Sequence, residues 1–129
     1  RSPQPSGTVP DMPWMEASDY SGAVPVDGYG PGFFRVAGEV ISGPVIVTAE
    51  GARPWGGLED VAALLVLAGS IDVLFLGMGA EIATPPRALI ATLDEGGIAA
   101  EPMSTPSAAR SYNVTLSEGR RVACALIPL

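Results

Sequence analysis

The sequence predicts an α/β domain in which helices cover the faces of a layered sheet. Its second half alternates apolar runs of strand length with segments whose apolar residues recur at helical spacing. Apolar residues make up 47% of the 129 residues and charged residues 16%, so the chain can bury a substantial core. We expect one domain over residues 22–129, preceded by an arm over residues 1–21, with the element order β-β-α-β-α-β-α-β.

The first part of the chain predicts an arm, a loop and two strands. Residues 1–21 are rich in proline and should form a flexible arm. Residues 24–32 are rich in glycine and proline and should form an irregular loop. The stretches 33–40 and 44–49 predict two strands, which the turn residues at 41–43 should join as a hairpin.

A turn, a helix and a buried strand should follow. Residues 53–57 combine proline and glycine around a tryptophan, which is typical of a turn. Apolar residues then recur at helical spacing from Leu58 to Ala68, and Gly69 is a suitable C-terminal end for this helix. The continuous apolar run at 71–76 predicts a strand covered on both faces.

The next helix and strand are indicated by proline positions. Thr84, followed by a proline, predicts the N-cap of a helix that ends at the glycines 96–97. Residues 98–103 should form a short strand. Because Pro102 has no N–H to donate to a neighbouring strand, we expect this strand at an edge of the sheet.

The same capping signal introduces the last helix. Thr105, again followed by a proline, predicts its N-cap, and the helix should run to about residue 118. Gly119 should end it. The apolar run at 122–127 predicts the final strand.

Several short motifs occur together in an order that is typical of one known family. They are Gly77-Met78-Gly79, Met103-Ser104-Thr105, the run from Ala108 to Tyr112-Asn113, and Glu118-Gly119-Arg120, with Val26 to Gly30 and Trp55 upstream. Over nearly the whole chain they resemble the Mth938-like family (DUF498), whose biochemical activity is largely unassigned. The resemblance implies a three-layer fold around a five-stranded mixed sheet. Mitochondrial relatives of this family are the complex I assembly factor 3 proteins, which implies an assembly role with subunits of a membrane complex as partners.

The charge of the chain argues against two classes of partner. The net charge is −7, and all 7 basic residues are arginines spread along the sequence. Nucleic acid is therefore not expected as a partner, because phosphate binding needs clustered positive charge. An anionic membrane surface is disfavoured for the same reason. The apolar stretch 61–80 contains Asp72, so no integral membrane segment is expected.

The chain has no histidine and a single cysteine, Cys124. The absence of histidine excludes Ser-His-Asp and Cys-His nucleophile pairs and histidine-based metal sites. Cys124 lies in the last apolar run and should be a buried, inert thiol. We expect no catalytic residues, no metal and no cofactor. No secretory signal is visible, which favours the cytoplasm.

Five residues form the candidate ligand-binding pocket: Gly77, Gly79, Thr105, Arg110 and Asn113. The first three follow strands, and ligands of open α/β sheets usually sit beyond the carboxyl ends of strands. Arg110 and Asn113 share one helix face, which should form a wall of the same pocket. A small anion or polar ligand is expected there, with the Arg110 guanidinium as its charged partner.

Each of these residues also has a structural interpretation. Gly77 and Gly79 suit a tight turn, and they form only part of a dinucleotide-binding fingerprint. Thr105 suits a helix cap. Arg110 suits a surface ion pair with Glu81 or Glu118.

Two functions from different classes remain open. The sequence favours an interaction or assembly protein without enzymatic activity, because no catalytic set is recognisable. The alternative is a protein that binds a small molecule or anion, including an undescribed enzyme, with its pocket at the carboxyl ends of the strands. We expect a monomer or a weak dimer in either case.

Overall fold

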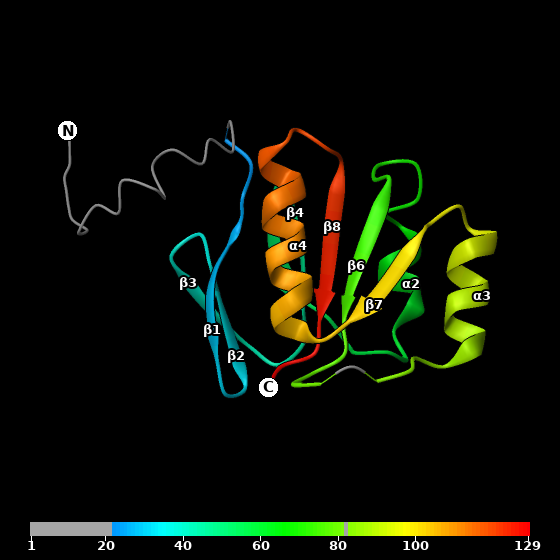
Figure 1. Cartoon of the computed structure of the whole chain (residues 1–129), viewed down its shortest axis with the longest axis horizontal. Coiled ribbons are helices and arrows are strands. Elements are labelled where there is room, and N and C mark those ends of the chain that lie inside the picture. The colour runs from blue at the N-terminus through cyan, green and yellow to red at the C-terminus, as the bar shows by residue number, and fades with distance from the viewer. Residues whose placement is uncertain (1–21, 82) are drawn as a thin grey trace.

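A computed structural model describes residues 22–81 and 83–129, so the predicted arm over 1–21 lies outside the described residues. The chain forms a five-stranded mixed sheet and a smaller three-stranded sheet (Figure 1). The elements are β1 (Val26–Gly30), β2 (Phe33–Val36), β3 (Glu39–Ser42), β4 (Val45–Thr48), β5 (Gly51–Pro54), α2 (Val61–Leu65), β6 (Val73–Gly77), α3 (Arg87–Glu95), β7 (Ala100–Met103), α4 (Thr105–Ser117) and β8 (Val122–Leu126).

The larger sheet has the strand order β5-β4-β8-β6-β7. It is mixed because β6 runs parallel to β7 and β8, whereas β4 runs antiparallel to β5 and β8. All residues of β6 and β8 are buried, as expected for central strands covered on both faces. The predicted α/β fold with a five-stranded mixed sheet is therefore confirmed, and the proline-containing β7 lies at an edge as predicted.

The side chains of β6 divide the core into two halves. Val73 and Phe75 pack in one cluster with Tyr112 and Leu116 of α4. Leu74 and Leu76 pack in the other, with the buried leucines of α2 and α3. Successive side chains of a strand point to opposite faces, so this single strand anchors helices on both sides of the sheet. Figure 1 shows α4 on one face and α2 behind the sheet.

The smaller sheet closes the α4 side of the molecule. Its strands form a meander in the order β1-β2-β3. Phe34 and Val36 of β2 point inward and join the same cluster as Tyr112. The Tyr112 hydroxyl also donates a hydrogen bond of 2.7 Å to the carbonyl of Val24, just before β1. The small sheet and α4 therefore form one packed unit on this face.

The predicted strand arrangement before α2 is wrong in two respects. Ala37 and Gly38 adopt positive φ values of 54° and 80°, so the hairpin turns there and joins β2 to β3, not at residues 41–43. Residues 24–32 contain β1 and are not an irregular loop. Glycines obscured this strand in the sequence. A Cβ at Gly30 would stand 2.5 Å from the tip of the Phe33 ring, which would have to turn aside.

Three element boundaries also differ from the prediction. The predicted turn at 53–57 begins inside β5. The helix expected from Leu58 is α-helical only over α2, and the N–H groups of Leu67 and Ala68 bond to carbonyls three residues back, as in a 3₁₀ turn. Thr84 does not cap α3, because two successive prolines delay the helix until Arg87.

Candidate functional site

Gly77, Gly79 and Thr105 meet at a closed junction between β6, α4 and the end of β8. The Thr105 hydroxyl donates a hydrogen bond of 2.6 Å to the carbonyl of Ile127 and accepts one of 2.9 Å from the Gly79 N–H. The Thr105 N–H donates to the Gly79 carbonyl at 2.7 Å. Thr105 is 0% exposed, so its polar groups are used inside the protein.

Close packing explains why a glycine occupies position 77. A Cβ there would lie 2.9 Å from the Thr105 Cα and 2.8 Å from a methyl group of Leu126. The predicted cap role of Thr105 is wrong by one residue, because Ser104 is the N-cap and its hydroxyl accepts from the Ser107 N–H. Thr105 is the first helical residue and faces inward.

Arg110 and Asn113 lie apart from that junction, in a groove between α4 and β1. Asn113 uses its side-chain amide on the β1 backbone. Its Oδ1 accepts a hydrogen bond from the Val26 N–H, its Nδ2 donates to the Val26 carbonyl, and both bonds measure 2.9 Å. The five predicted residues therefore lie in two separate places. Gly77, Gly79 and Thr105 form the buried junction, whereas Arg110 and Asn113 line the groove. Ligand binding by either group stays a prediction.

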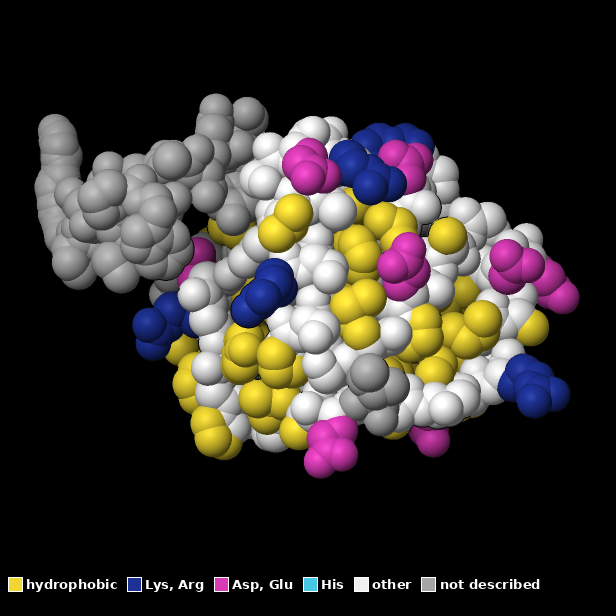
Figure 2. All heavy atoms as spheres, viewed as in Figure 1, with side chains coloured by type: hydrophobic (Ala, Val, Ile, Leu, Met, Phe, Trp, Pro, Cys, Tyr) yellow, Lys and Arg dark blue, Asp and Glu magenta, His cyan; other side chains and the backbone are white. Residues whose placement is uncertain are grey.

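The groove has a volume of about 870 Å³ and follows one face of α4. Its walls include Tyr29 of β1 and Ala109, Arg110, Asn113 and Val114 of α4. The side chains of Tyr29 and Val114 are 41% and 49% exposed. Figure 2 shows hydrophobic side chains gathered around the end of β1 and the first turns of α4. The groove therefore combines exposed apolar side chains with hydroxyl, amide and charged groups.

The Arg110 side chain is exposed and points from α4 into this region. Within residues 22–81 and 83–129 it makes no ion pair, so the alternative pairing with Glu81 or Glu118 is not found. Asp27 of β1 lines the same groove. The two walls of the groove thus carry charges of opposite sign that do not neutralise each other by direct contact.

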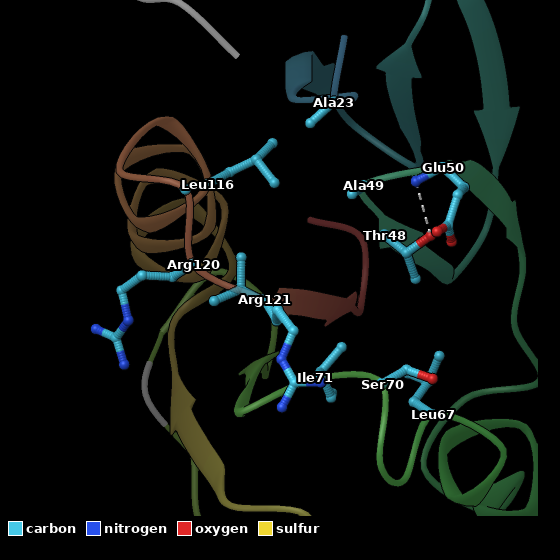
Figure 3. A pocket seen from close by; sticks show the side chains of 12 residues that line it. Ala23, Thr48, Ala49, Glu50, Leu67, Ser70, Ile71, Leu116, Arg120 and Arg121 are labelled. Carbon is cyan, nitrogen blue, oxygen red and sulfur yellow. Dashed lines mark hydrogen bonds between the residues drawn. The ribbon is translucent and has the colours of Figure 1, made fainter. Parts of the chain in front are cut away.

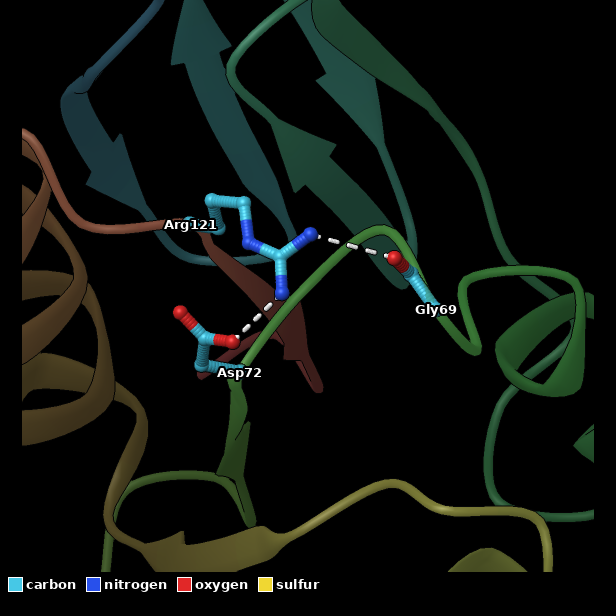
Figure 4. A network of polar contacts seen from close by, with 3 residues as sticks. All are labelled: Gly69, Asp72 and Arg121. Atoms are coloured by element: carbon cyan, nitrogen blue, oxygen red, sulfur yellow. Dashed lines mark hydrogen bonds and ion pairs between the residues drawn. The ribbon is translucent and has the colours of Figure 1, made fainter.

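A second hollow, of about 460 Å³, lies where β6 and β8 begin (Figure 3). Arg120 points away from its centre, and Arg121 turns toward the start of β6. The Arg121 guanidinium contacts Asp72 Oδ1 at 2.7 Å and the Gly69 carbonyl at 3.1 Å (Figure 4). The hydrogen bond from Arg121 lowers the pKa of the Asp72 carboxyl. This exposed pair ties the segment before β6 to the start of β8.

The thiol of Cys124 is completely buried in the centre of β8. Burial raises the pKa of this thiol far above its usual range. The predicted burial is confirmed.

Among the described residues, no cluster of three or more acidic, cysteine or histidine side chains is placed to hold a metal ion. No described helix is long and apolar enough to cross a membrane.

The sequence prediction missed the groove wall that β1 supplies. Asp27 and Tyr29 belong to it, and both fell in the segment expected to be an irregular loop. A usable signal was present, because Pro31 and Gly32 form a tight turn between Gly30 and the two phenylalanines that follow. Reading that turn as a hairpin would have predicted a strand before it.

A five-stranded mixed sheet, packed on one face against α4 and a small β-meander, defines a class of small layered α/β domains. The model of the family described as protein of unknown function (DUF498/DUF598) matches residues 26–127, and the chain belongs to this family. An uncharacterised protein of Rhodobacter capsulatus is 58% identical over 110 residues, which cover 85% of this chain and 89% of that protein. NADH dehydrogenase [ubiquinone] 1 alpha subcomplex assembly factor 3 of Danio rerio is 31% identical over 121 residues, covering 88% of this chain and 69% of that protein.

Solved structures share the same fold. A crystal structure of a protein from Bartonella henselae, described as an outer membrane protein, has a TM-score of 0.74 and 34% identity, covering 85% of this chain and 98% of that one. The solution structure of a Mth938-like domain from Bordetella pertussis has a TM-score of 0.69 and 25% identity, covering 84% and 87%. The predicted membership of the Mth938-like family is confirmed.

Proposed function

We propose that this protein is a non-enzymatic interaction protein of the assembly-factor kind, and that a partner protein binds in the groove between β1 and α4. Likeness to the Danio rerio assembly factor supports a subunit of a respiratory NADH dehydrogenase as the partner. The cytoplasm stays the predicted compartment. The sequence, which has no histidine, also lacks the side chain most often used as a general acid or base.

The observation that carries this proposal is the open groove, whose lining mixes exposed apolar side chains with polar ones. Tyr29 and Val114 stand on its two walls, and each leaves more than a third of its surface in water. Burial of apolar surface is the main favourable term in protein association, and tyrosine and arginine are enriched where partners bind. Arg110 adds a charged group without an internal partner among the described residues. The groove thus offers both apolar contact and a specific polar contact.

A photo-crosslinking experiment tests the proposal. A benzophenone amino acid replaces Val114 in the groove or, as the matched control, Val66 after α2, which is 67% exposed and lies outside the groove. Each variant is irradiated in a native extract of Rhodobacter capsulatus, the source of the 58% identical relative. We expect a discrete adduct from position 114 that contains a respiratory-complex subunit. Equal products from both positions, or none from position 114, would contradict the proposal.

A small anion is the second candidate ligand. It is favoured by Arg110 lying one helical turn after Ser107, with both side chains lining the groove. A guanidinium and a hydroxyl on one helix face suit a phosphate or carboxylate group. The junction of Gly77, Gly79 and Thr105 would hold the start of α4 in place and would not contact the anion.

A titration with inorganic phosphate separates this candidate from the first. Chemical shifts of residues 106–111 should move in the wild-type protein and stay fixed in Arg110→Ala. Arg87→Ala on α3, whose side chain is also exposed, is the control and should respond like the wild type. Equal responses from the two variants would count against a specific anion site.

A further inference from the structure

The free edge of β1 faces the groove. In the order β1-β2-β3, β1 pairs with β2 on one side and is an edge strand on the other. Edge strands present backbone N–H and C=O groups that can pair with another chain. The side of β1 that does not pair with β2 faces α4, since Val26 bonds to Asn113 of that helix. Figure 1 shows β1 and α4 side by side, with the β1–β2 turn near the start of α4.

The Asn113 side chain makes the same kind of hydrogen bonds with this edge that a neighbouring strand would make. Its amide both accepts from and donates to the backbone of the same residue, Val26, at 2.9 Å in each direction. In an antiparallel ladder, the N–H and C=O of one residue make the same exchange of two bonds with the residue opposite. Asn113 therefore satisfies one position of the edge and marks the end of the open part.

Among the described strands, none pairs with the remainder of this edge. Asp27, Gly28 and Tyr29 line the groove beyond Val26. The three residues from Asp27 to Tyr29 span about 10 Å at roughly 3.4 Å per residue. A short extended segment can lie along this length, between β1 and the α4 face that carries Arg110 and Val114.

We propose that the partner binds as an extended peptide that adds a strand to the free edge of β1. This inference rests on the proposed function and specifies how the same groove recognises its partner. The segment carries a carboxylate that pairs with Arg110 and an apolar side chain that packs on Tyr29 and Val114. Backbone hydrogen bonds supply affinity, and alternate side chains supply specificity, as in other cases of strand addition.

Charge favours this occupant over a second copy of the chain. Two copies with a net charge of −7 each repel, whereas a short segment with a single carboxylate is repelled far less and offers Arg110 a partner. An amphipathic helix would leave the β1 backbone groups unpaired. A strand satisfies them, and hydrogen-bonding groups buried without a partner are costly.

The test uses a phage-displayed library of linear peptides, selected on the full chain. We expect selected peptides to alternate apolar and polar residues and to contain an acidic residue. Synthetic copies are then N-methylated one residue at a time. Methylation at alternate positions should weaken binding by about tenfold or more, because each removes an N–H that pairs with β1. Methylation at the intervening positions should have little effect.

Variants of the protein complete the test. Arg110→Glu should weaken the same peptides, and Arg87→Glu on α3 should not. Amide exchange along residues 27–29 should slow when peptide is bound. Selected peptides with helical spacing and no alternation in the N-methyl series would overturn strand addition while leaving the groove as the partner site.

Other outcomes separate the two proposals. If no peptide is selected and Arg110→Glu abolishes self-association, the groove joins two copies and the peptide proposal is wrong. If peptides bind as strands but position 114 never crosslinks to a respiratory subunit, strand addition stands and the proposed partner is wrong.

Discussion

Thr105 and Asn113 both tie α4 to another part of the fold by two side-chain hydrogen bonds, yet their surroundings differ. Thr105 joins Gly79 and Ile127 inside the protein and is fully buried. Asn113 joins both backbone groups of Val26 at the margin of an open groove. Closed packing leaves no room for a ligand at the first site. The second leaves the adjoining strand edge accessible, and the proposed partner site lies there.

The largest expected effect comes from Thr105→Val. Valine keeps the shape of threonine but removes the hydroxyl, which leaves the Gly79 N–H and the Ile127 carbonyl without their partner. Each unsatisfied buried group costs about 1–3 kcal/mol, so the free energy of unfolding should fall by about 2–6 kcal/mol. Urea denaturation measures this loss.

Thr115→Val is the matched control for that variant. The Thr115 hydroxyl donates only to carbonyls of its own helix, so the loss should stay within about 1 kcal/mol. Equal losses in the two variants would show that the Thr105 hydrogen bonds stabilise the fold no more than the bonds of Thr115 within α4.

Gly77→Ala should have the next largest effect. The added methyl group would stand 2.9 Å from the Thr105 Cα, which is backbone and cannot turn aside. Overpacking of this kind costs about 1–3 kcal/mol. Gly28→Ala is the control, because its methyl group enters open space and its φ is not in the left-handed region. A stable Gly77→Ala protein would mean that β6 and α4 can move apart, which would undermine the closed junction.

Asn113→Ala should have a smaller effect on stability, confined to β1. It removes two partly solvated hydrogen bonds, worth about 1–2 kcal/mol together, and leaves Val26 accessible to water. Hydrogen exchange should accelerate at the Val26 amide and leave β6 unchanged. Ser117→Ala, which loses only a bond within α4, is the control. Faster exchange throughout the core would instead show that Asn113, like Thr105, stabilises the whole domain.

Arg110→Ala should have the smallest effect on stability. Its side chain makes no ion pair among the described residues, and substitutions at such exposed positions stay within about 0.5 kcal/mol. Thermal unfolding should match the wild type, while photo-crosslinking from position 114 decreases. A large stability loss would show that Arg110 supports the fold and would remove it from the proposed recognition surface.

The second half of the domain was largely predictable because its local signals agree with its packing. The apolar run of β6, the proline of β7 and Gly119 at the end of α4 each had one dominant physical interpretation. The first half was less predictable, because glycines weaken the pattern of β1 and because Ala37 adopts a positive φ that its type rarely takes.

The candidate site shows the same division. The sequence singled out Arg110 and Asn113 as sharing one helix face, since helical spacing is a local property. It joined them to Gly79 and Thr105 in one pocket, although the structure buries Thr105 against β8 and opens the groove toward β1. Which element packs beside a helix depends on contacts between distant residues, and the Asn113–Val26 bonds span 87 positions.

The sequence by itself determined the family, the α/β class, the central strands and the surface position of Arg110. These follow from motif order, apolar periodicity and the high cost of burying an isolated charge. Tertiary structure alone decided that Asn113 pairs with the edge of β1 and that Thr105 is inaccessible. Both depend on how α4 sits between two sheets, and that placement is set by the combined packing of side chains from both halves of the chain.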